Sequence, residues 1–404
     1  MEQKLQRKHD RVIVAGGGPV GSVAGYLLAR AGVPVTMIER ATDVVLDYRA
    51  STFHPPTLDL LEDSGITAAL VEMWLVCPTV QIRDREIGKV AEFDVTRLKN
   101  ETRHPYRLQC EQFKLVGFLY KALAQIPGID LRFGHEVIDI RETEDEVVVG
   151  AEHDGSRIEV RGDIVIGSDG GRSTARKLID VAFPGLTYPE HFLVAGTRFD
   201  FRAHMPDIAS VNYTADPVRW FMLLQIPDMW RILVPVAPEV SPDDAVSDES
   251  LQSSLKTIYP RPDDYEIVVR AIYRVHQRVA DTYRRGRVFL AGDAAHLNNP
   301  LGGMGLNGGL HDVISLTDRL IAWWTGKADA AILEGYEPQR RPEAINAIHA
   351  ITTRNKKLLE ERDPAVRARN LDEIRRTAAD PERSYQYLLD ATMISSLRRS
   401  AMIR

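Results

Sequence analysis

The chain has 404 residues and a formal net charge of -6, so it is long enough for about two or three domains and lacks the basic excess typical of nucleic-acid binding. Its two cysteines, Cys77 and Cys110, are too few for a disulfide framework or a structural zinc site, and we expect both to be packing residues. Residues 1–10 are charged, and no apolar run approaches the roughly 20 residues of a membrane span. We therefore expect a cytoplasmic protein without a metal, nucleic-acid or membrane site.

Residues 12–40 predict a βαβ unit that binds a dinucleotide. A short apolar strand leads into Gly16-x-Gly18-x-x-Gly21 and an apolar-periodic helix, and a second strand ends at Glu39. In such a unit Gly16 forms the tight turn, Gly18 lets a diphosphate approach the backbone, and Gly21 lets the helix pack on the strand. The helix N-terminus faces the diphosphate, and Glu39 accepts hydrogen bonds from an adenosine ribose. NAD and FAD satisfy this pattern equally.

The next ninety residues carry one candidate phosphate ligand. Arg49 precedes a helix predicted over 58–64, and a guanidinium group matches phosphate oxygens, although an ordinary surface arginine is an equal alternative. Residues 77–105 predict strands and turns. Residues 106–125 then predict an amphipathic helix that ends before a Pro-Gly turn.

Residues 129–166 predict a β-meander, with Asp154-Gly155 as a hairpin turn. An apolar strand then ends in the glycine turn of Asp169, with a helix over 173–178. Residues 186–280 are rich in β-forming and aromatic side chains and predict a separate sheet, one face of which walls an apolar pocket.

A third glycine turn follows the strand that ends at Gly292-Asp293, and residues 300–309 lead into a long apolar helix. The N-terminus of that helix suits a developing negative charge. Residues 342–404 predict charged helices, interrupted at Pro364 and Pro381, without recognisable chemistry.

All three glycine turns follow an apolar strand. If the strands share one parallel sheet, the turns meet at its carboxyl edge, where one large cofactor explains them together. A second GxGxxG between a strand and a helix is absent from the sequence, so a permanent second dinucleotide site is not predicted.

These motifs make the chain resemble the single-component FAD-dependent aromatic hydroxylases, the flavoprotein monooxygenases of the p-hydroxybenzoate hydroxylase type, over about residues 10–345. The resemblance rests on GGGPVG with Glu39, Asp169-Gly170 with Arg172 and Ser173, Gly292-Asp293 followed by Pro300 and GGMGLNGG, Arg49, and Arg107-x-Gln109. It implies an α/β, p-hydroxybenzoate hydroxylase-like fold: a Rossmann-type FAD-binding domain with a β-meander, a β-sheet substrate domain and a helical C-terminus. The implied divisions are an FAD-binding domain in two parts, 1–185 and 281–345, a substrate domain, 186–280, and C-terminal helices, 346–404. Strands within 77–105 are candidates to join the substrate domain.

The resemblance also implies a resident FAD and a transient NADH or NADPH. It assigns the diphosphate to Gly16, Gly18 and Gly21, and the adenosine end to Glu39 and its neighbour Arg40. The diphosphate and ribityl region is assigned to Arg49, Arg107 and Gln109, and the ribityl chain to Asp293. The flavin pyrimidine edge is assigned to the segment with Pro300, Gly303, Gly305, Leu306 and Asn307, and both FAD and the nicotinamide nucleotide are assigned to Asp169.

The implied reaction is hydroxylation of a small phenolic or heteroaromatic ring, with or without a carboxylate. NAD(P)H reduces FAD, and O2 then forms a C4a-hydroperoxyflavin that transfers one oxygen atom. The protein holds the ring, excludes water and helps to ionise a phenol. Tyr213 and His54 are candidate bases, and Arg231 is a candidate partner of the ring or its carboxylate, each with a structural role as its alternative. His296 is expected to be structural.

Two other functions stay open. One is an epoxidase, halogenase or isoprenoid reductase of the same fold, although Trp74 alone does not supply a halogenase motif. The other is a non-catalytic nucleotide-binding regulator. The sequence does not name the substrate, although its length favours a single ring, and it leaves open whether the protein is a homodimer.

Overall fold

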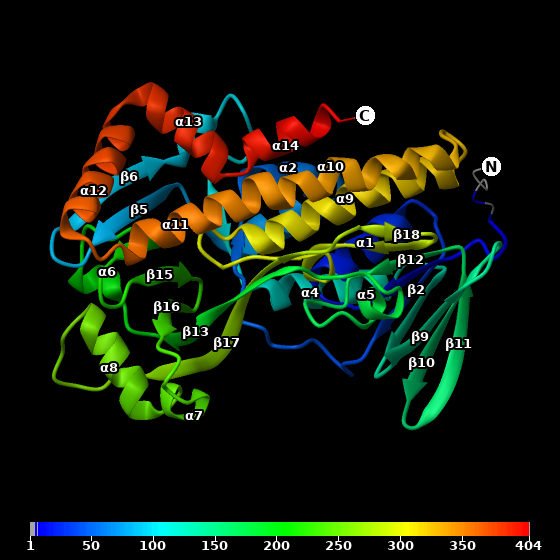
Figure 1. The fold of residues 1–404 in the computed structure, drawn as a ribbon, viewed down its shortest axis with the longest axis horizontal. Helices are drawn as coiled ribbons and strands as arrows, with labels where there is room; N and C mark the ends of the chain where they lie inside the picture. The colour runs from blue at the N-terminus through cyan, green and yellow to red at the C-terminus, as the bar shows by residue number, and fades with distance from the viewer. Residues whose placement is uncertain (1–4, 6, 404) are drawn as a thin grey trace.

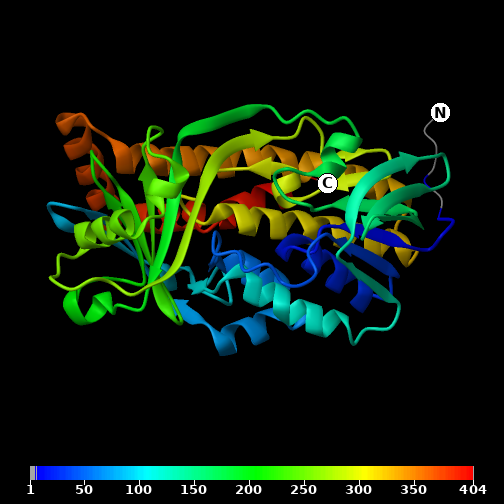
Figure 2. The ribbon, with the colours of Figure 1, turned by 90° about the horizontal axis from the view of Figure 1, so that it is seen from below.

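The computed structural model describes residue 5 and residues 7–403. A parallel sheet and an eight-stranded sheet lie at opposite ends of an elongated molecule, and long helices run between them (Figures 1 and 2). Within the described residues, no helix is both long and apolar enough to span a lipid bilayer.

The parallel sheet contains the predicted βαβ unit. Its strand order is β18-β19-β12-β1-β2-β8, and every neighbouring pair from β19 to β8 is parallel. The bounds are β1 Val12–Ala15, β2 Val35–Glu39, β8 Ile129–Phe133, β12 Ile164–Gly167, β18 Arg284–Arg285 and β19 Val288–Leu290. All residues of β1, β12 and β19 are buried, because helices pack on one face of the sheet and the β-meander packs on the other.

The helices of this half are α1 Pro19–Arg30, α2 Pro55–Leu61, α3 Ile66–Met73, α4 Gln112–Leu123, α5 Thr174–Leu178 and α9 Met304–Trp324. Two predicted bounds are wrong. The first is the helix predicted over 106–125, because residues 107–109 form β7, which pairs with β3 (Thr52–Phe53) and β4 (Leu75–Cys77). The second is the helix predicted from residue 58, which begins at Pro55, since proline suits the first helical position.

The meander is shorter than predicted. It contains β9 Glu136–Glu142, β10 Val147–His153 and β11 Ser156–Gly162, whereas β8 and β12 belong to the parallel sheet. The predicted hairpin turn is confirmed: Asp154 and Gly155 both have positive φ, 48° and 74°, as a type I′ turn requires.

The eight-stranded sheet confirms the separate sheet and extends it. Its order is β20-β17-β13-β16-β15-β14-β5-β6, so the early strands β5 and β6 join it through β14. The bounds are β5 Thr79–Asp84, β6 Gly88–Asp94, β13 Gly185–Thr197, β14 Val211–Ala215, β15 Phe221–Ile226, β16 Met229–Val236, β17 Ile267–Val279 and β20 His296–Leu297. The division into domains stays a prediction.

Each face of this sheet has its own core. Leu223 and Ile232 pack beneath α7 (Pro242–Ala245) and α8 (Asp248–Ile258), with α6 (Phe201–His204) alongside. On the opposite face, Tyr213 and Leu233 belong to a core that includes residues of the C-terminal helices.

These helices cross from the parallel sheet to the eight-stranded sheet (Figure 1). Their bounds are α10 Tyr336–Glu343, a π-helical segment Ala344–His349, α11 Ala350–Glu360, α12 Pro364–Ala379, α13 Pro381–Ala391 and α14 Ile394–Ala401. Pro364 and Pro381 occupy the first positions of α12 and α13, so the predicted breaks also start the next helices.

Candidate cofactor and substrate sites

The three glycine turns meet at the carboxyl edge of the parallel sheet. A Cβ atom on Gly16, whose φ is +102°, would lie 2.7 Å from the Cα of Asp169. Ser168 Oγ donates to the Gly16 carbonyl at 3.1 Å, and Arg176 Nη1 donates to the Ala294 carbonyl at 2.8 Å. The predicted convergence is confirmed. The buried Arg176, which was not selected from the sequence, connects the second turn to the third.

The glycines of the first turn have different surroundings. A Cβ on Gly21 would lie 1.9 Å from the Gly16 oxygen, so helix and strand touch there, whereas a Cβ on Gly18 would meet no protein atom within 4 Å. Gly18 precedes α1, and no side chain caps that helix. Free N–H groups beside open space suit a diphosphate.

Glu39 already has backbone partners. Its carboxylate accepts hydrogen bonds from the N–H groups of Gly17 at 2.6 Å and Ala41 at 2.8 Å, while the neighbouring Arg40 is exposed. Glu39 therefore shapes the first turn. Binding of the ribose by Glu39 or Arg40 stays a prediction.

Asp169 supports the second turn. Its carboxylate accepts hydrogen bonds from Ser173 Oγ at 2.5 Å and the Ala175 N–H at 3.0 Å, which holds the turn to α5. Arg172 is exposed. The role of Asp169 toward nucleotides stays a prediction.

Asp293 differs from Glu39 and Asp169, because no described residue hydrogen-bonds its partly buried carboxylate. Burial raises the pKa of Asp293, and the positive charge of Arg49 acts in the opposite direction. The preceding Gly292 is held by Asp312, which accepts its N–H at 3.1 Å. Asp312 also accepts from His296 at 2.8 Å and Arg340 at 2.9 Å, so His296 has a structural contact, as expected.

Polar groups without partners lie beside Arg49, whose charge acts on Asp293. Arg49 forms an ion pair with Asp47, with Nη2 2.5 Å from Oδ2, and its carbonyl accepts from Arg231 Nη2 at 3.4 Å. Arg231 is 3% exposed, yet its Nε and Nη1 have no partner, and neither does the Tyr273 hydroxyl. Burial lowers the pKa of Arg231, with Tyr273 opposing this shift. This set of unused donors and acceptors fits a large polar cofactor.

The third turn ends earlier than the glycine pattern suggested. Gly303, with φ of 70°, precedes α9, so Gly305, Leu306 and Asn307 lie within its first turn. A Cβ on Gly309 would lie 2.9 Å from the Gly292 Cα, so this glycine permits helix packing.

Two buried side chains hold the start of α9 to residues 52–57. Asn307 Oδ1 accepts the His54 N–H at 2.8 Å, and its Nδ2 donates to the Thr52 carbonyl at 2.8 Å. His54 Nε2 donates to the Gly302 carbonyl at 2.8 Å, which leaves Nδ1 as an acceptor without a partner. Burial and the charge of Arg107 lower the pKa of His54 well below its ordinary value, so the ring is neutral.

Arg107 and Gln109 lie on the same short strand, β7, and have different neighbours. Gln109 is fully buried, and its Nε2 donates to Thr52 Oγ1 at 2.9 Å. Arg107 Nη1 donates to the Tyr213 hydroxyl at 3.2 Å, and Nη2 donates to the Ala391 carbonyl at 3.3 Å. Their cofactor roles stay predictions, and the position of Arg107 favours a different role.

Arg107 and Tyr213 line an apolar cavity on the inner face of the eight-stranded sheet. One wall of the cavity comes from β5 and β6, and the other comes from α11 and α13. Gly302 of the third turn also lines the cavity. The remaining lining residues are Val80, Ile82, Phe93, Val95, Asn355, Leu358, Leu359, Tyr387, Leu388, Ala391 and Thr392. Its clear volume is about 30 Å³, room for about two or three water molecules, so a ring enters only when side chains or a wall move.

The cavity changes the predicted substrate site in two ways. From residues 186–280 only Tyr213 lines it, and one wall comes from the C-terminal helices, to which the sequence assigned no chemistry. Of the three catalytic candidates, Tyr213 lines the cavity, whereas Arg231 lies beside Arg49 and His54 lies beneath the third turn. The helical periodicity of apolar residues along α11 and α13 indicates that one face of each helix is buried. It does not identify the surface that this face covers.

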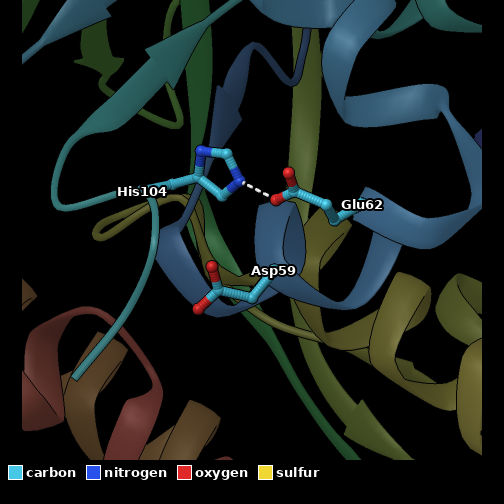
Figure 3. Close-up of side chains that lie close together, drawn as sticks. All are labelled: Asp59, Glu62 and His104. Carbon is cyan, nitrogen blue, oxygen red and sulfur yellow. Dashed lines mark hydrogen bonds and ion pairs between the residues drawn. The ribbon is translucent and has the colours of Figure 1, made fainter.

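A separate cluster contains Asp59, Glu62 and His104, all partly buried (Figure 3). His104 Nε2 is hydrogen-bonded to the Glu62 carboxylate, which lowers the pKa of Glu62, and Asp59 accepts the Arg103 N–H at 3.1 Å. These contacts tie the loop before β7 to the end of α2. Glu62 and His104 form an ion pair, and Asp59 has a backbone partner, so each of the three side chains already has a partner within the protein.

Comparison with known proteins identifies the family. The model of the FAD binding domain family matches residues 10–350. Para-nitrophenol 4-monooxygenase of Pseudomonas sp. (strain WBC-3) is 31% identical over 96% of this chain and 97% of that protein. 6-Hydroxy-3-succinoylpyridine 3-monooxygenase HspB of Pseudomonas putida (strain DSM 28022 / S16) is 32% identical over 84% of this chain and 86% of its own length. The crystal structure of p-nitrophenol 4-monooxygenase PnpA from Pseudomonas putida DLL-E4 superimposes with a TM-score of 0.90 at 32% identity, covering 96% of this chain and 97% of that one. The chain therefore belongs to the FAD-binding family of flavoprotein aromatic hydroxylases.

Proposed function

We propose that the protein is an FAD-dependent monooxygenase that uses NAD(P)H and O2 to hydroxylate a single phenolic or hydroxylated heteroaromatic ring. The observation that carries this proposal is the cavity with Tyr213 and Arg107, which reaches Gly302 beside the cofactor edge. Two relatives are named for a nitrophenol and a hydroxylated pyridine, both of which are single rings.

The cofactor edge fits FAD through groups that lack protein partners. Gly18 and the N-terminus of α1 would hold the diphosphate, Asp293 the ribityl chain, and the N-terminus of α9 the flavin pyrimidine edge. Bound FAD supplies the electron transfer and oxygen-transfer chemistry. Arg231, with Nε and Nη1 free, is assigned to this edge and not to the ring.

The cavity residues bind the ring and exclude water. Tyr213 contacts the phenol and relays its proton: the hydroxyl oxygen takes the phenol proton as the hydroxyl releases its own. The apolar walls from β5, β6, α11 and α13 limit water. Because the surroundings of His54 disfavour its protonated form, His54 acts as a hydrogen-bond acceptor rather than as the base.

A substrate panel tests this function. The purified holoenzyme is incubated with phenols and hydroxypyridines, with and without a carboxylate, while NAD(P)H oxidation and O2 uptake are followed. At least one ring is expected to stimulate NAD(P)H oxidation and to yield a product with one oxygen atom from labelled O2. Failure of every ring to stimulate oxidation contradicts hydroxylation. An absence of bound flavin contradicts the cofactor assignment as well.

A further inference from the structure

Arg107 is a buried cation whose hydrogen-bond partners are both neutral. Its side chain lines the cavity and the residue is only 4% exposed. Nη1 donates to the Tyr213 hydroxyl and Nη2 donates to the Ala391 carbonyl, while Nε has no partner. Burial of a guanidinium group without a counter-ion in an apolar environment is unfavourable.

None of the described residues that line the cavity balances this charge. Its lining residues include no aspartate or glutamate, and its other polar members are neutral tyrosine, asparagine and threonine side chains. Burial and the positive charge of Arg107 lower the pKa of His54, so His54 is neutral and adds no charge beside the cavity.

Arg231, the arginine that the sequence suggested as substrate partner, has different surroundings. It lies next to Arg49, with the carboxylates of Asp47 and Glu111 near enough to act on its charge, and it does not line the cavity. Its charge is therefore partly balanced before any ligand binds.

We infer that Arg107 selects anionic substrates: its free Nε and its positive charge bind a phenolate or an equally charged ring substituent beside Tyr213. This inference rests on the proposed function, because it concerns the same substrate cavity. A charge-assisted hydrogen bond in a dry cavity is stronger than one to a neutral group, so the ionised form of the ring binds best.

Equilibrium binding to the oxidised holoenzyme tests the inference without turnover. 4-Nitrophenol, at a pH that ionises it, and the neutral 4-nitroaniline of similar shape are titrated while the flavin absorbance is followed. The wild-type protein should bind the anion more tightly. Arg107→Met should weaken binding of the anion by about tenfold to a hundredfold, the usual loss of a hydrogen bond to a charged group, and should change 4-nitroaniline affinity less than about threefold.

Two further variants separate charge from packing. Arg107→Lys keeps the charge and should retain part of the preference for the anion. Arg97→Met removes an exposed arginine from the 3-10 turn after β6 and should leave both affinities unchanged. Flavin content and the unfolding midpoint of each variant show whether it is folded.

Equal weakening of both ligands by Arg107→Met, or failure of the wild type to bind the anion, overturns the inference. Because no turnover is measured, the result is independent of the hydroxylation assay. A preference for the anion that depends on Arg107 supports the inference even if no ring is hydroxylated.

Discussion

The cofactor edge and the substrate cavity adjoin at Gly302, yet they are built from different parts of the chain. The cofactor edge consists largely of backbone, with glycine turns such as that of Gly16 approaching neighbouring strands too closely for any side chain. The cavity consists of side chains brought together from distant segments, with Arg107 and Ala391 hydrogen-bonded across 284 positions. The first region therefore depends on the absence of side-chain atoms, and the second depends on their chemical identity.

The largest effect is expected from adding one methyl group to the cofactor edge. Gly21→Ala would place a Cβ atom only 1.9 Å from the Gly16 carbonyl oxygen, so α1 must shift away from β1. Overpacking of this kind costs about 1–3 kcal/mol and occasionally more, and with so short a contact we expect at least about 3 kcal/mol. The measurement is the free energy of unfolding in denaturant.

Gly18→Ala is the matched variant, because its Cβ meets no protein atom. It should keep the apoprotein stability within about 1 kcal/mol, since an added methyl group without a clash is tolerated, and should lose FAD. Full flavin content in Gly18→Ala would contradict the assignment of the diphosphate to this turn.

Asp293→Ala tests the side-chain contribution at the same edge. The Asp293 carboxylate has no described protein partner, so its removal should cost little stability while weakening FAD binding by about tenfold to a hundredfold. The measurements are the FAD dissociation constant and the unfolding free energy of the apoprotein. A loss of stability without a loss of FAD affinity would make Asp293 a structural residue.

Tyr213→Phe tests the cavity alone. FAD content and the rate of flavin reduction should be unchanged, while substrate oxygenation slows by about tenfold or more, because a positioned proton acceptor is lost. Rapid mixing separates the two half-reactions. If both half-reactions slow equally, Tyr213 is not the base, and the separation between cavity and cofactor edge is weaker than the structure suggests.

The last prediction concerns acid stability. Burial lowers the pKa of His311 to about 3 from an ordinary value of 6.5. Between these values the unfolded chain binds a proton that the folded chain does not, so stability is full above pH 6.5 and falls as the pH falls toward 3. His311→Gln should reduce the slope of unfolding free energy against pH within this window, because the unfolded variant no longer takes up that proton. His54 should still contribute in the same direction, and an unchanged slope would contradict the burial of a neutral His311.

The same contrast explains what could be predicted from the sequence. The turns at Gly16, Asp169 and Asp293 were predicted because each follows its strand directly, and the rule for parallel sheets places them together. The residues of β7 were predicted as helix because their strand pairing depends on β3 and β4, which lie elsewhere in the chain.

The substrate cavity was beyond the reach of local patterns. Arg107 stands two positions before Gln109 in a cofactor motif, but its side chain lies against Tyr213 and Ala391, and neither neighbour can be inferred from spacing. The C-terminal segment was predicted to be helical, because helical periodicity is local. That periodicity does not reveal which surface the apolar stripe covers.

The wall formed by α11 and α13 also matters for laboratory evolution. Leu358 and Leu388 line the cavity from helices that carry none of the glycine turns. Libraries confined to such positions can change which ring fits while the enzyme still loads its flavin, so new substrate preferences are accessible without first rebuilding the redox centre.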